Sequence, residues 1–181
     1  MGIVTLDDPA SVVNAKARAE GWPFRCDSEL VFDKAELNVL RDVWRAMAVK
    51  AGIPRHSDAR ALDSVLRRLT ILERLVDADG NRRFFVRHQG TYLAAVMGNN
   101  EGTFIDERIP PELMPRWSTV FDAVLDSAVP LRVVVRFELQ KLSYAAGEAF
   151  IAPLSDENGA TTLLLTGVFI KPREDEGAAT P

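Results

Sequence analysis

Cysteine and histidine are scarce in this chain of 181 residues, which has one cysteine, Cys26, and two histidines, His56 and His88. A single cysteine excludes an internal disulfide and a cysteine-based zinc site. The two histidines are far apart in sequence, and neither belongs to a metal-spaced motif such as H-E-x-x-H. Cys26 has no fixed partner in the sequence and is a poor nucleophile candidate. We therefore expect no metal site.

Long apolar runs and a strong excess of one charge are also missing. No stretch of about 18 apolar residues occurs, and the N-terminal MGIVTLDDPAS lacks the basic start and apolar run of a secretory signal. The chain has 22 Lys plus Arg against 26 Asp plus Glu. Basic residues outnumber acidic ones between positions 41 and 87, but they are mixed with acids and lack interleaved aromatics. We expect a cytoplasmic protein without membrane contact, and nucleic-acid binding is disfavoured.

Motifs of catalysis and nucleotide binding are absent as well. The sequence contains no G-x-G-x-x-G, P-loop or G-x-S-x-G. The segment 77–81, Asp-Ala-Asp-Gly-Asn, resembles the start of a calcium loop, but its glycine comes too early and His88 stands where a glutamate is needed. We interpret it as a hairpin turn, and we expect no enzymatic activity.

Apolar residues make up 47% of the chain, enough for a sizeable core. Their helical spacing predicts a helix over 33–51. Asp33 is the expected N-cap, with Glu36 completing a capping box and Phe32 packing on Leu37 as a hydrophobic staple. Further helices are predicted at 9–20, after residue 57, at 90–97 and at 113–128. The helix at 9–20 is mostly alanine on its apolar side, so it is expected to bury little, and the chain at 21–24 is expected to be irregular.

Strand patterns occupy the rest of the chain. Residues 131–139 alternate, which places 131, 133, 135, 137 and 139 on the inward face. Two hairpins are expected, 70–76 with 82–87 and 146–154 with 161–170. The order of elements predicts an α+β fold: one five-stranded antiparallel sheet with helices on one face. The expected organisation is an N-terminal extension at 1–32, N-terminal helices at 33–69, a core at 70–170 and a flexible tail at 171–181.

Helix-on-sheet domains can enclose an apolar pocket with a few polar groups. The candidate lining residues are Phe85, Arg87, Tyr92, Val96, Met97, Trp117, Phe121, Val135, Phe137 and Phe150. A filled core is the alternative interpretation of the same residues. Arg87 could bind a carboxylate, but a role in tying down the following helix is favoured.

Short motifs recur in a defined order: Leu40-Arg41-Asp42-Val43-Trp44, Ile53-Pro54-Arg55 with Asp58, Arg87 with Gly90-Thr91, Gly98, Asp106, Pro111-Glu112, Trp117, Val120, and Pro153-Leu154-Ser155-Asp156 with Gly159. In this order the chain resembles a PAS domain over about residues 37–170, specifically the single-PAS-domain proteins of alphaproteobacteria. It departs from them in a shorter loop at 98–102, in His88 where an apolar residue is usual, and in the helical sequence after Asp58. The resemblance implies a PAS-like sheet preceded by N-terminal helices.

The resemblance also implies a function. We expect a non-catalytic sensory or regulatory PAS protein of bacterial signalling that binds a small ligand, a partner protein, or both. The alternative is a ligand-free protein–protein scaffold or adaptor with a filled core. Photoactive flavin-binding relatives need a cysteine within 89–100, and heme-binding relatives often use a histidine within 110–128. Neither is present, so both cofactors are disfavoured and an unidentified small ligand stays open.

The expected partners are a second copy of the chain and a bacterial signalling or regulatory protein. The resemblance places the homodimer contact on the helix at 33–51. The candidate dimer or partner residues are Leu37, Leu40, Trp44 and Met47.

Overall fold

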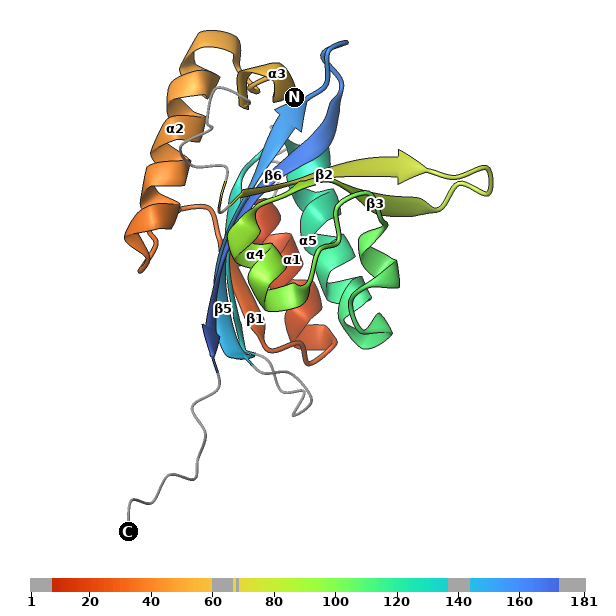
Figure 1. The fold of residues 1–181 in the computed structure, drawn as a ribbon. Coiled ribbons are helices and arrows are strands. Elements are labelled where there is room, and N and C mark those ends of the chain that lie inside the picture. Colours follow the sequence, from red (N-terminus) through yellow and green to blue (C-terminus); the bar gives the residue numbers. More distant parts are fainter. Residues whose placement is uncertain (1–7, 60–66, 68, 137–143, 173–181) are drawn as a thin grey trace, which may run out of the picture.

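A computed structural model describes residues 8–59, 67, 69–136 and 144–172. Its centre is a six-stranded antiparallel sheet in the order β1-β4-β5-β6-β2-β3 (Figure 1). The strands are β1 Phe24–Asp27, β2 Leu69–Val76, β3 Arg82–Gln89, β4 Leu131–Arg136, β5 Tyr144–Ser155 and β6 Thr161–Pro172. The five expected strands are present, and the α+β fold is confirmed.

Helices cover both faces of this sheet. The α-helices are α1 Pro9–Ala19, α2 Ala35–Ala51, α3 His56–Ala59, α4 Thr91–Met97 and α5 Met114–Ser127, and the short 3₁₀ helices are η3 Ile105–Glu107 and η4 Pro111–Leu113. Figure 1 shows α1, α4 and α5 on one side of the sheet, here called the inner face, and α2 on the opposite, outer face. The expected arrangement had helices on one face only, whereas α2 covers the other face. Strands β5 and β6 bury apolar side chains on both faces, so a single helical layer would leave one apolar face open to water.

The sixth strand comes from the N-terminal extension. Residues Phe24–Asp27 pair with β4, where Cys26 lies opposite Val133. The Asn14 side chain on α1 accepts a hydrogen bond from the Cys26 backbone N–H and donates one to the Cys26 carbonyl, each at 2.8 Å. The Asn14 amide thereby pairs with the backbone of Cys26, in a strand of four residues that is too short for its alternation alone to predict it.

Helix α1 buries more than its composition suggested. Ala10, Val13 and Ala17 are each no more than 3% exposed, and Ala10 and Val13 belong to the same core as α5. The expectation that this helix buries little was wrong. Alanine contributes little area by itself, but its small size lets a helix pack closely against its neighbours.

Helix α2 packs on the outer face through a separate cluster of buried residues, here called the outer core. Trp44 lies edge-on to Phe150, with ring centroids 6.3 Å apart, and its indole N–H donates to the Pro153 carbonyl at 3.0 Å. A Cβ at Gly167 would lie 2.4 Å from Leu40 Cδ2. Glycine at this position therefore allows α2 to approach β6 closely.

The start of α2 is held by a residue far away in sequence. Its N-cap is Lys34, which makes no side-chain capping bond, so the prediction of Asp33 as the capping residue was wrong. Instead, the Glu148 carboxylate on β5 accepts hydrogen bonds from the Asp33 and Lys34 backbone N–H groups at 3.1 and 3.2 Å. Phe32 and Leu37 are both buried in the outer core, as the expected staple requires.

The buried thiol of Cys26 gives a testable pH dependence. Burial, and secondly the charge of Asp27, raise its pKa from the usual 9.0 to about 12. Between these values the unfolded chain has lost a proton that the folded chain keeps, so stability falls as pH rises above about 9. We expect unfolding titrations from pH 8 to 11 to show this loss and Cys26→Ala to reduce its slope. Equal slopes for both proteins would contradict a buried thiol.

Candidate functional site

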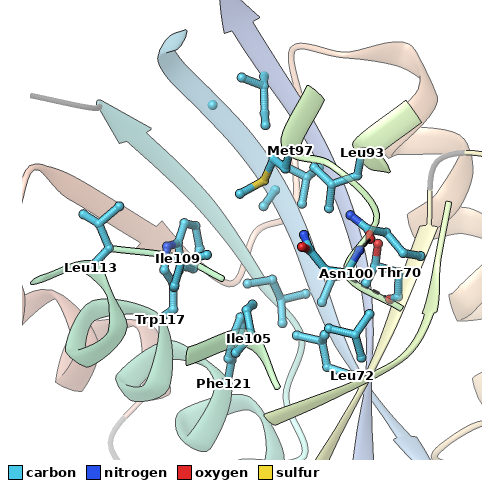
Figure 2. Close-up of a pocket in the computed structure, with 18 of the residues that line it drawn as sticks. Thr70, Leu72, Leu93, Met97, Asn100, Ile105, Ile109, Leu113, Trp117 and Phe121 are labelled. Atoms are coloured by element: carbon cyan, nitrogen blue, oxygen red, sulfur yellow. Dashed lines mark hydrogen bonds between the residues drawn. The ribbon is translucent and has the colours of Figure 1, made fainter. Parts of the chain in front are cut away.

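A cavity of about 100 Å³ lies between the inner face of the sheet and the segments from α4 to α5 (Figure 2). Most of its wall is aliphatic or aromatic. The lining residues are Thr70, Leu72, Val86, Gln89, Leu93, Met97, Asn100, Ile105, Ile109, Pro110, Leu113, Trp117, Phe121, Val135, Gly147, Glu148, Ala149, Ile151, Thr166, Val168 and Ile170.

One end of the cavity is apolar and aromatic. Trp117 and Phe121 lie one helical turn apart on α5 and stack with their ring centroids 5.9 Å apart. Phe121 also meets the buried ring of Phe84 edge-on at 5.0 Å. Figure 2 shows Leu113 and Ile109 beside Trp117 at this end. These contacts make a firm wall with large aromatic surfaces.

The other end carries polar side chains from β2, β3 and the loop after α4. Thr70 on β2 lies opposite Gln89 on β3 in the strand register. The Gln89 amide donates to the Gly98 carbonyl at 3.2 Å and accepts from the Asn100 N–H at 2.5 Å. The loop at 98–100 is thereby fixed against the strand end. Figure 2 shows Thr70 and Asn100 together, at the end away from Leu113.

The cavity wall carries no free charge. Among the described lining residues, Glu148 alone is ionisable as an acid or base at neutral pH, and its carboxylate points to the outer face. There it accepts a hydrogen bond from Arg132 Nε at 2.7 Å, and Arg132 also bonds Asp27 at 3.0 Å. Burial by itself lowers the pKa of Arg132, but these two carboxylates raise it above its usual value overall. The charges are therefore satisfied on the far side of the sheet.

Two arginines fasten the cavity walls. Arg74 on β2 bonds Asp122 and Asp126 of α5 at 2.9 and 2.6 Å. Arg83 on β3 donates to both carboxylate oxygens of Asp106 at 2.9 Å and to the Glu107 carboxylate at 2.8 Å, both residues in η3. The hydrogen bonds to Asp106 and then Glu107 raise the pKa of Arg83. The hairpin β2–β3 is thus tied both to α5 and to η3.

Four of the expected pocket residues line this cavity: Met97, Trp117, Phe121 and Val135. Two expected residues on β3 do not, because the strand faces the other way from the expected register. Phe84 and Val86 are the inner residues, whereas Phe85 packs edge-on against Phe104 with centroids 5.4 Å apart. Arg87 pairs with Glu73 across the hairpin, so it neither faces the cavity nor ties down α4.

Three further expected residues lie elsewhere. Phe150 faces α2 in the outer core, and Val96 is 39% exposed. The Tyr92 ring stacks on Phe169 at 6.0 Å, outside the lining. Phe137 lies outside the described residues.

Sequence reasoning missed the polar end of the cavity. Thr70 and Leu72 are two residues apart on β2, so their side chains lie on the same face of the strand. Assigning Leu72 to the inner face would therefore have placed Thr70 there as well. The register shifts between Ile71 and Leu72, where β3 carries an extra residue. This bulge brings Gln89 to the inner face although simple alternation from Val86 would not.

The candidate partner residues on α2 are occupied within the chain. Leu37, Leu40 and Trp44 are at most 8% exposed, and Met47 is partly buried against the same core. Their packing on the sheet accounts for the apolar stripe seen in the sequence. Any contact between copies through α2 therefore involves its other side, where Val39 is 52% exposed.

Two negative findings concern only the described parts of the chain. No helix there has the length and apolar character that crossing a bilayer requires. No group of three or more His, Cys, Asp or Glu side chains in those parts could hold a metal ion.

Comparison with known families decides the classification. A family model described as PAS domain matches residues 32–170. The chain belongs to the PAS-domain family. The matched range of this PAS domain contains α2 through α5, strands β2 to β5, and β6 as far as Ile170. Membership places the chain among sensory signalling domains.

Other comparisons are more distant. The structure of an RNA-binding light-oxygen-voltage receptor is similar to this PAS domain over 66% of the present chain, with 10% sequence identity and a TM-score of 0.40. The alignment spans 34% of the receptor chain, about a third of its length. No curated protein matches the sequence.

Proposed function

We propose that this PAS domain is a non-catalytic sensor that binds a small ligand in the inner cavity and signals through α2. The observation that carries the proposal is the cavity itself, which shares strand β5 with the contact that holds α2. The cavity's size supports a ligand smaller than heme or flavin. The resemblance noted in the sequence supports a bacterial, cytoplasmic setting, a homodimer and a regulatory partner protein.

Strand β5 connects the ligand site to the helix. Gly147, Glu148 and Ala149 contribute to the cavity wall. The Glu148 side chain leaves the opposite face of the same strand and bonds the backbone at Asp33 and Lys34. A ligand that moves this part of β5 would alter the hydrogen bonds at the start of α2.

A second connection runs through α4 and the neighbouring strand. Leu93 on α4 lines the cavity, and the adjacent Tyr92 hydroxyl lies 3.4 Å from the Ile170 carbonyl. The Tyr92 ring stacks on the Phe169 ring. Lys34 Nζ lies 4.2 Å from the centroid of the Phe169 ring, in a cation–π contact. Both connections end at Lys34, the N-cap of α2.

Thermal melts and hydrogen exchange with a panel of small uncharged molecules test this proposal. A ligand that binds only the folded state should raise the melting temperature. It should also change amide exchange at residues 33–44. We expect Glu148→Gln to keep the thermal shift but reduce the exchange response, and Glu157→Gln, in the exposed turn between β5 and β6, to change neither.

Two outcomes would contradict the proposal differently. A panel without any thermal shift would favour the ligand-free scaffold. Stabilisation with unchanged exchange at α2 would keep the binding site and reject α2 as its output.

A further inference from the structure

We propose that the ligand is uncharged, about the size of one substituted aromatic ring, and carries one hydrogen-bonding group that binds between Thr70 and Asn100. This inference rests on the proposed function, because it specifies what the inner cavity binds. It follows from an unpaired buried hydroxyl, the charge distribution around the cavity, and the cavity's size and aromatic wall.

Thr70 provides the first argument. The residue is 4% exposed, lines the cavity, and has a hydroxyl without a hydrogen-bond partner among the described residues. A buried unpaired hydroxyl destabilises the folded state, so such groups are normally satisfied. Thr166, in the same wall, differs because its hydroxyl donates to the Thr70 carbonyl at 3.2 Å. The Thr70 hydroxyl is therefore available to a ligand atom that donates or accepts.

Asn100 adds a second polar group at the same end. Its backbone N–H is fixed by the Gln89 side chain, and its carbonyl accepts from the Thr103 hydroxyl at 2.8 Å. Its side-chain amide bonds no other described residue and lies in the cavity wall. An amide offers both donors and an acceptor. Together with Thr70 it suits a hydroxyl, carbonyl or carboxamide head group.

The charge distribution excludes an ionised head group. Among the described residues, no cation lines the cavity, and the carboxylate of Glu148 is bonded on the outer face. An ion moved from water into such a wall loses hydration without a countercharge. Neutral ligands are therefore favoured over their charged analogues of the same shape.

Size and shape limit the rest of the ligand. The cavity measures about 100 Å³ and is partly open to the surface, whereas an engineered, closed apolar cavity of about 150 Å³ in another protein binds benzene. A ligand with one aromatic ring is therefore the largest that this space takes. Trp117 and Phe121 present stacked rings at the end away from Thr70. A flat ring against this wall would place a single substituent toward Thr70 and Asn100.

Calorimetric titration with phenol and toluene tests the head group. The two probes have similar shape, but only phenol can hydrogen-bond to Thr70. We expect phenol to bind the unmodified protein about 3- to 10-fold more tightly than toluene, the size of one net hydrogen bond. Thr70→Val should remove this preference. The control Thr119→Val should keep it, because Thr119 lies outside the cavity lining and its hydroxyl already donates to the Pro115 carbonyl at 2.8 Å.

Benzamide and benzoate test the charge, using one shape with and without a negative charge. We expect benzamide to bind and benzoate to show no heat at the concentrations that saturate benzamide. The melting temperature gives an independent measurement that needs no ligand. Thr70→Val should raise it by about 2–4 °C by removing an unpaired hydroxyl, whereas Thr166→Val should lower it.

The outcomes separate this inference from the proposed function. Equal affinity for phenol and toluene, in the unmodified protein and in Thr70→Val, would mean that a trapped water satisfies the hydroxyl, and would overturn the head-group inference while leaving a ligand cavity. Benzoate binding as tightly as benzamide would overturn the neutral ligand. Absence of binding by all four probes would overturn both this inference and the ligand-binding function.

Discussion

Replacing Glu148 with alanine should lower the free energy of unfolding by about 3 kcal/mol. Glu148 is 7% exposed, and its carboxylate receives hydrogen bonds from Arg132 and from two backbone N–H groups at the start of α2. Its removal leaves the partly buried guanidinium of Arg132 with one acceptor fewer and two backbone amides without theirs. The effect should fall at the lower end of the range for broken buried pairs, because Arg132 keeps its bond to Asp27. Urea unfolding of the purified protein measures it.

The control is Glu157→Ala, which removes the same charge from an exposed turn. We expect that variant to differ from the unmodified protein by less than about 0.5 kcal/mol. If both variants unfold alike, Glu148 does not hold α2, and the connection from the cavity through β5 fails with it.

Replacing Trp44 with alanine should cost about 3–5 kcal/mol of unfolding free energy, as is usual for large aromatic residues in a core. The indole is 8% exposed, packs on Phe150 and donates to Pro153. The substitution creates a cavity between α2 and the sheet and leaves the Pro153 carbonyl without this donor. Differential scanning calorimetry or urea unfolding gives the size of the loss.

Trp22→Ala is the matched control, because Trp22 is only partly buried in the turn before β1. We expect it to cost less than half as much as Trp44→Ala. A larger loss at Trp22 would mean that the outer core contributes less than its burial indicates.

The burial of Trp44 also changes how a homodimer has to be tested. A substitution there weakens the attachment of α2 to its own sheet, so loss of a dimer would not identify Trp44 as an intermolecular contact. Exposed positions on the helix, such as Val39, separate the two effects because they lie outside the outer core.

At the polar end of the cavity, one residue is expected to affect both ligand binding and the stability of the domain. The Thr70 hydroxyl lowers the stability of the folded chain while it has no partner, and we propose that it recognises the ligand. Such opposition between stability and function is typical of binding sites. Substituting valine at this position is therefore expected to have opposite effects on melting temperature and on ligand discrimination.

Local patterns were sufficient to identify most secondary structure. The alternation of Leu131, Val133 and Val135 correctly predicted the inner face of β4, and the apolar spacing around Trp117 and Phe121 correctly predicted α5. Both patterns are strong because each residue's direction follows from the period of its own element. The PAS resemblance rested on short motifs along the same chain, and the family match confirms it.

Tertiary structure decided what no local pattern contains. In β3, two adjacent phenylalanines satisfy either register, and only packing against α5 selects Phe84 for the core. The cap of α2 comes from Glu148, 115 residues after Asp33. The sixth strand depends on Asn14 bonding Cys26. The sequence determined which segments are helices and strands, because those preferences act over a few residues. Only the folded chain determined which hydroxyl remains unpaired in the cavity, because that depends on atoms brought together from β2, β3 and β6.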